Sequence, residues 1–250
     1  MKAIYKQIRQ ALQNAADENN RNTSQHFFKD SEQAKVYGVK MPEVKRIAKA
    51  FFGEIKAFPK AQIFALCEEL WQSGYLEEAV VACTFSEALH RQYEPADFVD
   101  FERWVSNYVD NWASCDTLCN HTVGTFVMMY PGYVNELKRW AASPNRWLKR
   151  AAAVTLIIPA RRGMFLTDIL EIAKTLLLNP DDLVQKGYGW MLKAASMSEN
   201  FAKGDSTIKK EHLDAVFNFV IKHKAVMPRT ALRYAIEKMP PEMKEEAMKK

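Results

Sequence analysis

The chain has 250 residues, of which 48% are hydrophobic and 26% charged, and its formal net charge is +5. The length would permit two ordinary domains, and the composition supports an all-helical fold. Residues 1–8 start an amphipathic helix instead of an apolar signal segment, and no later run has the length needed to cross a bilayer. We therefore expect a cytoplasmic protein with no membrane partner.

Helical patterns follow one another along the chain. With 9 glycines and no Asn-Gly or Asp-Gly pair, the sequence carries no signal for hairpins between alternating strands. Apolar residues recur at helical spacing instead, as in segments 63–71 and 213–221. The polar segment 199–210 is expected to be a loop between helices. The prolines that fall near expected helix starts or turns are Pro59, Pro95, Pro131, Pro144, Pro180 and Pro228.

A repeat of 36 residues organises the middle of the chain. Segments 76–80, 112–116, 148–152 and 184–188 start 36 residues apart, and each has a large apolar residue first and a small residue fourth. This pattern is typical of a helix pressed closely against its neighbour in a helical-pair repeat. In this register a carboxylate, Asp116, takes the position that Val80, Ala152 and Tyr188 fill in the other segments.

The chain is predicted to form a single domain. No linker rich in Pro, Ser or Gly divides it, and stacked repeats hold together through their neighbours. We therefore expect residues 1–250 to form one elongated all-α domain.

The four cysteines are predicted to be buried thiols. They lie within helical patterns and without Cys-x-x-Cys spacing, which disfavours disulfides and structural zinc. Cys115, Cys119 and His121 are the strongest metal candidates, but positions 115 and 121 point in different directions on a helix. We therefore expect no metal and no cofactor. The four positions are Cys67, Cys83, Cys115 and Cys119.

Charge is unevenly distributed along the chain. Residues 1–60 carry 12 basic and 6 acidic side chains, residues 61–138 carry 3 and 12, and residues 139–233 carry 16 and 8. Two basic stretches flanking an acidic one are expected if the basic parts hold a polyanion. Basic residues alternate with aromatic ones in 139–150 and 186–193, a combination that favours phosphate contacts and base stacking. A solvated surface is the alternative interpretation.

One aromatic and acidic constellation is a candidate site. Trp112 and Asp116 are four residues apart, so on one helix the indole lies beside the carboxylate. Trp190 falls near the slot that matches Asp116 two repeats later, and Arg150 and Lys186 are expected to face the same groove. Core packing is the alternative for each tryptophan. For Asp116 the alternatives are a helix cap and an ion pair with Arg150.

A carboxylate beside indole rings suits one reaction of damaged DNA. Alkylation at purine N3 or N7 makes the base cationic and a good leaving group, and its departure generates positive charge on the deoxyribose. A fixed carboxylate such as Asp116 stabilises that charge and orients or deprotonates the attacking water. Indole faces attract the cationic base through their quadrupole. Asp116 has to stay ionised for this role, and a neighbouring Arg150 favours that state.

At these residues the chain resembles the AlkD-type DNA glycosylases, the DNA alkylation repair family of HEAT-like repeats. The resemblance runs from segment 37–43 to segment 228–232, which is most of the chain. Its specific marks appear in order and at fitting separations. They are Trp112-x-x-x-Asp116, Trp147-Leu148-Lys149-Arg150-Ala151-Ala152 and Gln185-Lys186-Gly187-Tyr188-Gly189-Trp190.

The resemblance implies a right-handed α-helical solenoid whose concave basic groove holds duplex DNA, and metal-independent removal of cationic N3- or N7-alkylated purines. In such enzymes the aspartate matching Asp116 is catalytic, and the tryptophans matching Trp112 and Trp190 flank the lesion. Family members act without drawing the damaged base into a deep pocket. We expect a monomer. The predicted DNA-binding residues are Arg150, Lys149, Lys186, Lys193, Arg146 and Arg229.

Two departures from the family pattern bear on activity. Lys193 stands where the glycosylases tend to have arginine, so the charge is kept but the planar fork that grips phosphate is lost. Segment 26–30 lacks a clear equivalent of the aromatic residue that active relatives place against DNA, and Phe27 or Phe28 either replaces it or belongs to the core. A non-catalytic binder of damaged or branched DNA is therefore the second hypothesis. A protein-binding scaffold is the third.

Overall fold

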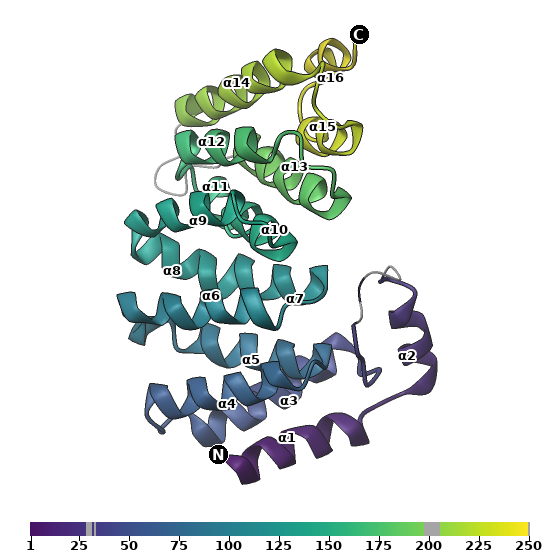
Figure 1. The fold of residues 1–250 in the computed structure, drawn as a ribbon, viewed down its shortest axis with the longest axis vertical. Helices are drawn as coiled ribbons and strands as arrows, with labels where there is room; N and C mark the ends of the chain where they lie inside the picture. Colours follow the sequence, from purple (N-terminus) through teal and green to yellow (C-terminus); the bar gives the residue numbers. More distant parts are fainter. Residues whose placement is uncertain (29–31, 33, 198–205, 250) are drawn as a thin grey trace. The chain divides into compact units, whose positions relative to one another are not determined.

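A computed structural model describes residues 1–28, 32, 34–197 and 206–249, and this part of the chain consists mainly of helices joined by turns and loops (Figure 1). Outside the helices the described residues hold an isolated β-bridge between Lys35 and Tyr75 and no longer strand. The prediction of an all-α fold is confirmed. By their internal contacts the residues form two compact units, 1–126 and 127–250. The single domain, the right-handed solenoid and the concave groove stay predictions.

The first unit is organised around one helix, α5. This helix is buried along most of its length and packs against α3, α4, α7 and the π-helical segment η3. Figure 1 shows α3, α4 and α5 running side by side. The elements of this unit are α1 (Lys2–Asn14), α2 (Glu18–Gln25), α3 (Met41–Ile55), α4 (Lys60–Gln72), α5 (Leu76–Ala88), η1 (His90–Gln92), η2 (Pro95–Asp97), α6 (Phe98–Asn107), α7 (Trp112–Thr117), η3 (Leu118–Val123) and the first residues of α8 (Gly124–Met129).

Two buried carboxylates fix the N-terminal part of the chain to α5. Glu77 is 1% exposed and accepts hydrogen bonds from the backbone N–H groups of residues 37–39, at 3.0, 2.8 and 3.1 Å. Glu78 is fully buried and accepts from Arg9 at 2.9 Å and from the hydroxyl of Tyr37 at 2.6 Å. A buried charge is tolerated only when it is partnered in this way. Part of the acidic segment 61–138 therefore serves the core of the unit, which the charge pattern did not predict.

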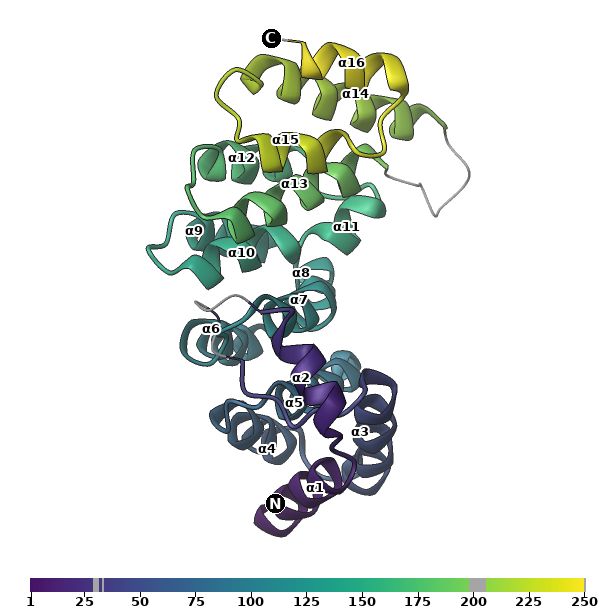
Figure 2. The same cartoon turned by 90° about the vertical axis from the view of Figure 1, so that its right-hand side faces the viewer.

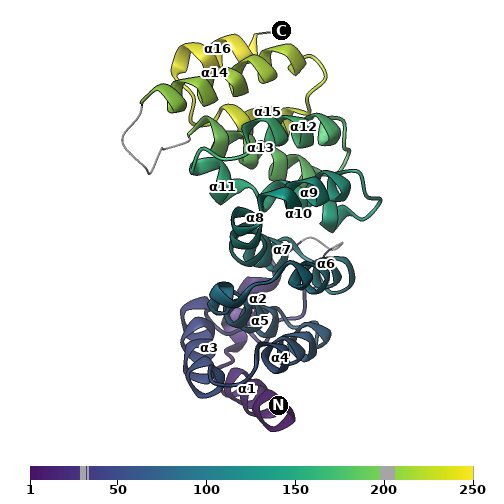
Figure 3. The same cartoon turned by 90° about the vertical axis from the view of Figure 1, so that its left-hand side faces the viewer.

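The second unit is built of two packed sets of helices. Helices α9, α12 and α14 form one set and α10, α13 and α15 the other, and each helix packs against its neighbours within the set and against the opposite set. Figure 2 shows α13 against α15, and Figure 3 shows α9 against α10. The elements that follow α8 are η4 (Pro131–Tyr133), α9 (Val134–Ala141), α10 (Arg146–Val154), α11 (Ile157–Arg161), α12 (Leu166–Leu176), α13 (Asp182–Ser196), α14 (Ser206–His223), α15 (Arg229–Ile236) and α16 (Pro241–Met248).

The helices that contain the four segments start at close to the predicted spacing, but the last two start two residues earlier than the predicted register places them. The corresponding helices α5, α7, α10 and α13 begin at residues 76, 112, 146 and 182, which are 36, 34 and 36 apart. The fifth position of these four helices holds Val80, Asp116, Arg150 and Lys186. Arg150 and Lys186 therefore take the positions that the predicted register gave to Ala152 and Tyr188. The caps fix this register because their side chains accept first-turn N–H groups. They are Asn111, Asn145 and Asp181.

Several smaller predictions can be compared directly. Pro59 and Pro228 precede helices as caps, and Pro95 and Pro131 open 3-10 turns, as expected. The predicted loop 199–210 lies partly outside the described residues, and it was wrong for 206–210, which belong to α14. All four cysteines are buried, as predicted. Within the described part of the chain, no helix combines the length and the apolar character that a membrane span requires.

Candidate functional site

Helix α7 carries the predicted Trp112 and Asp116. Its cap, Asn111, accepts the backbone N–H of Ser114 at 2.9 Å, so the helix starts at Trp112. Ser114 and Cys115 face the core, whereas Trp112 and Asp116 are half-buried one turn apart. Residues four apart on a helix lie on one face, so the indole and the carboxylate share the less buried side of α7. A cap role for Asp116 is excluded because Asn111 fills that position.

Residues near the N-terminus contact Trp112. Glu32, which is 5% exposed, accepts the backbone N–H of Trp112 at 3.0 Å. The indole Nε1–H points to the carbonyl of Phe27 at 3.5 Å, and the Phe28 ring lies 6.0 Å from the indole. Phe27 itself is 68% exposed, so the core interpretation is wrong for this residue. No signal in the sequence indicated the contact with Glu32, because 80 positions separate the two residues.

Exposure separates the tryptophans into two groups. Trp112 and Trp190 are the two of the six that stay half-buried, so core packing does not account for them. The others are buried, and the hydroxyl of buried Tyr188 donates to the Leu177 carbonyl at 3.1 Å. The stacking role predicted for the aromatic residues of segment 139–150 and for Tyr188 is therefore wrong. The buried tryptophans are Trp71, Trp104, Trp140 and Trp147.

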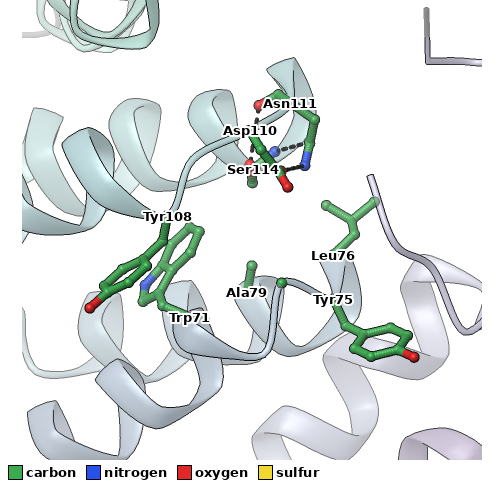
Figure 4. Close-up of a pocket in the computed structure, with 9 residues that line it drawn as sticks. Trp71, Tyr75, Leu76, Ala79, Tyr108, Asp110, Asn111 and Ser114 are labelled. Atoms are coloured by element: carbon green, nitrogen blue, oxygen red, sulfur yellow. Dashed lines mark hydrogen bonds between the residues drawn. The ribbon is translucent and has the colours of Figure 1, made fainter. Parts of the chain in front are cut away.

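A small cavity lies behind the start of α7 (Figure 4). Trp71 and Tyr108 line one side of it, and Asp110, Asn111 and Ser114 line another. It leaves room for about one water molecule, which is too small for a nucleobase. Burial raises the pKa of the Asp110 carboxyl, opposed by a hydrogen bond from Asn111, and the charge of Glu32 adds to the rise. This cavity therefore belongs to the support of α7 and is not a base-binding pocket.

Three predicted residues share one face of α13. Lys186, Trp190 and Lys193 occupy its half-buried stripe, while the intervening positions face the core. Lys186 pairs with Asp182 at 3.3 Å, and Lys193 pairs with Glu237 at 2.7 Å. The ammonium of Lys193 also lies 5.3 Å from the centre of the Tyr234 ring. The stripe thus places an indole between two cations.

Helix α10 contributes cations beside this stripe, since α10 packs against α13. Arg146 pairs with Asp181 at 2.8 Å and lies over the Trp147 ring at 5.0 Å. Lys149 is half-buried. Arg150 is only 5% exposed and donates from Nη1 to the Leu183 carbonyl of α13. Arg150 therefore holds α10 against α13, and its predicted contact with DNA is restricted to the small fraction left exposed.

Helix α15 places the last predicted cation, Arg229, at its exposed first residue. The backbone of α13 approaches α15 closely at Gly189, where an added Cβ would lie 2.7 Å from the Cβ of Tyr234. A glycine is therefore required at this crossing. The six predicted cations and Trp190 all belong to the second unit, whereas Trp112 and Asp116 belong to the first. Their meeting in one groove stays a prediction.

The described residues contain no group of three or more His, Cys, Asp or Glu side chains that could hold a metal ion. Cys115 and Cys119 are fully buried in the core of the first unit. His121 lies on the other side of the same helical segment, 3.5 Å from Glu87. The cluster considered from the sequence is therefore not assembled among these three residues.

Helix α13 carries two cations and a half-buried indole on one face, a combination that is typical of surfaces that bind polyanions. The model of the DNA alkylation repair enzyme family matches residues 8–239, and the chain belongs to this family. A solved structure described as a predicted DNA alkylation repair enzyme from Enterococcus faecalis is similar to it, with a TM-score of 0.72 at 16% identity over 90% of this chain and 97% of that chain. At this identity the likeness establishes the fold. A comparison with curated proteins found no match.

Membership of the family gives the chain a role in the repair of alkylated DNA, with DNA as substrate. Three short segments of the sequence carry the resemblance to this family. They lie on α7, α10 and α13, and each of these helices carries half-buried candidate residues.

Proposed function

We propose that the protein is a DNA glycosylase that hydrolyses the N-glycosidic bond of cationic N3- or N7-alkylated purines in duplex DNA. Asp116 is the catalytic carboxylate, and Trp112 and Trp190 contact the cationic base. The observation that carries the proposal is the pairing of Trp112 and Asp116 on the less buried side of α7. It is supported by the family of the chain, whose name gives the repair role but not the chemistry.

The chemistry follows from the charges involved. When the C1′–N bond of an alkylated purine breaks, its electron pair neutralises the cationic base, which leaves as a neutral molecule, and positive charge develops on the sugar. Asp116 stabilises that charge and accepts a proton from the water that attacks C1′. The face of an indole attracts a cationic ring through its quadrupole. No step requires a metal ion or a cofactor.

DNA binding is assigned to the cations of the second unit. Lys186 and Lys193 flank Trp190 on α13, and Arg146 and Lys149 lie on the adjacent α10. Arg229 opens α15, which packs against α13. Cations that contact phosphates release counterions, so affinity falls steeply with salt. A protein-binding scaffold would instead present an acidic or apolar surface. It would not bind duplex DNA with an affinity that falls steeply as salt rises.

The test uses a duplex that contains a single 7-methylguanine. Asp116→Asn removes the charge with almost no change in shape, and it should slow the formation of abasic sites by on the order of 10²–10³. The matched control is Glu54→Gln, an exposed carboxylate on α3 that should leave the rate unchanged. Equal rates for wild type and Asp116→Asn would remove Asp116 from the mechanism.

A second measurement separates the alternatives. Salt-dependent binding of the duplex without base release by the wild-type protein would replace the glycosylase proposal with that of a non-catalytic DNA binder. Binding that is insensitive to salt would contradict both DNA-based functions. The affinity of Asp116→Asn for the duplex should equal that of the wild type or exceed it, because the substitution removes a negative charge from a site for a polyanion.

A further inference from the structure

Glu32 is a buried carboxylate that the proposed chemistry does not use. Its side chain accepts the backbone N–H of Trp112 at 3.0 Å, and only 5% of the residue is exposed. Removing a carboxylate from water is costly unless its partners compensate. A carboxylate that is buried at this cost has a structural reason to be there. The hydrogen bond from the backbone N–H of Trp112 is such a reason.

The position of that contact on α7 matters. Trp112 is the first residue of the helix, so its N–H group has no partner within the helix. The cap residue Asn111 serves the N–H of Ser114 and leaves that of Trp112 to Glu32. Asn111 and Glu32 therefore hold the first turn of α7 from two separate parts of the chain.

The side chain of Trp112 is held from the same direction. Its Nε1–H lies 3.5 Å from the Phe27 carbonyl, and its ring lies 6.0 Å from the ring of Phe28. Backbone and indole of the same tryptophan are thus both contacted by residues before position 33. A shift of Glu32 would move the start of α7, and with it Asp116 one turn further along.

We propose that Glu32 is a positioning residue for the site on α7: its hydrogen bond to the backbone of Trp112 sets where the indole and the Asp116 carboxylate lie relative to the damaged nucleotide. This inference rests on the proposed function. Glu32 transfers no proton and touches no reacting atom in this role. Its effect on the rate comes from geometry, to which bond cleavage is sensitive at the level of about 1 Å.

Two substitutions separate the hydrogen bond from the charge. Glu32→Gln keeps an oxygen that accepts the N–H of Trp112, whereas Glu32→Ala removes every acceptor. In single-turnover release of 7-methylguanine, Glu32→Ala should be slower than wild type by between about tenfold and a hundredfold. The rate of Glu32→Gln should stay within about threefold of the wild-type rate, because this variant keeps most of the free energy of the hydrogen bond to Trp112. The matched control is Glu54→Gln, an exposed carboxylate on α3, which should not change the rate.

A readout independent of turnover follows the indole itself. The measurement uses a protein in which the other half-buried tryptophan is replaced by Trp190→Phe. In this background a neutral quencher such as acrylamide should quench the tryptophan fluorescence of Glu32→Ala more strongly than that of the parent protein. The quenching of Glu32→Gln should equal that of the parent protein. Rates are measured well below the melting temperature of each variant, so that loss of folded protein does not imitate loss of position.

The outcomes are distinct. A slow Glu32→Ala with increased quenching, restored by Glu32→Gln, supports the positioning role. Equal slowing by both substitutions would assign the effect to charge, and an unchanged rate with a lowered melting temperature would make Glu32 purely structural; either result overturns the inference. If the wild-type protein releases no base, the proposed function fails and the inference with it, whereas base release that is indifferent to Glu32 leaves the proposed function standing.

Discussion

The three backbone hydrogen bonds to Glu77 predict a large and specific loss of stability. Glu77 is 1% exposed, and its carboxylate is the acceptor for the N–H groups of residues 37–39 at 2.8–3.1 Å. One oxygen serves two of these groups and the other serves Tyr37. In Glu77→Gln the amide keeps the first oxygen but turns an NH₂ group toward the N–H of Tyr37. One charge-assisted bond is lost and two donors face each other.

The size of the effect follows from these contacts. A hydrogen bond to a charged group contributes about 1.5–3 kcal/mol, and an unsatisfied buried N–H costs about 1–3 kcal/mol. Glu77→Gln should therefore destabilise the protein by about 3 kcal/mol, which is a fall of about 6–12 °C in the melting temperature for a chain of this length. Glu77→Ala leaves all three N–H groups unpaired and should cost more.

The assay is thermal unfolding followed by circular dichroism at neutral pH. The reference is Glu54→Gln, because this carboxylate is exposed on α3 and should leave the midpoint unchanged. A Glu77→Gln midpoint within about 2 °C of wild type would show that the carboxylate contributes less than one ordinary hydrogen bond. The role assigned to the acidic residues of α5 would then be incorrect.

Two further predictions concern packing and pH. Gly189→Ala should lower the melting temperature, because the added Cβ would lie 2.7 Å from the Cβ of Tyr234. In Gly187→Ala on the same helix the nearest atom to the added Cβ is 3.5 Å away, so this substitution should raise the stability by up to about 1 kcal/mol through helix propensity. A change of the melting temperature in the same direction for both variants would contradict the packing of α13. Burial raises the pKa of the Asp110 carboxyl in the folded protein above its usual 3.8. The protonated carboxyl therefore favours the folded state, and this contribution to stability is fully present below pH 3.8 and is lost as the pH rises through the raised pKa of the folded state. Asp110→Asn should therefore melt higher than wild type at neutral pH, and this advantage should disappear in acid; a lower midpoint at neutral pH would refute it.

The sequence predicted the helices well, because their signals are local. Apolar spacing in segments such as 63–71 and prolines at helix starts are properties of neighbouring residues, and both correspond to observed elements. The repeat register failed because it was aligned on apolar residues, while the spacing between the second and third helices is two residues shorter than the other two spacings. Aligning the capping residues Asn111, Asn145 and Asp181 would have given the correct register.

The candidate site could be predicted only in part, because burial and tertiary contacts are not recorded in local sequence patterns. Trp112 and Trp190 are half-buried, whereas Trp140 and Trp147, which have the same pattern of neighbouring cations in the sequence, are buried. The contact of Trp112 and Trp190 with a damaged base stays a prediction. Composition cannot distinguish a stacking ring from a core ring, since both alternate with charges on a helix. The contact between Glu32 and Trp112 depends on tertiary structure, so no local pattern records it.

The carboxylates paired with the cations of α10 and α13 have a consequence for how DNA is held. Arg146, Lys186 and Lys193 each already have an anionic neighbour within the protein. On the proposed function, an incoming phosphate exchanges places with that neighbour and does not meet a bare charge, so each contact returns less free energy than a count of basic residues suggests. Intact duplex is then held loosely and released quickly, and the discrimination between damaged and normal bases falls to the indoles and to Asp116.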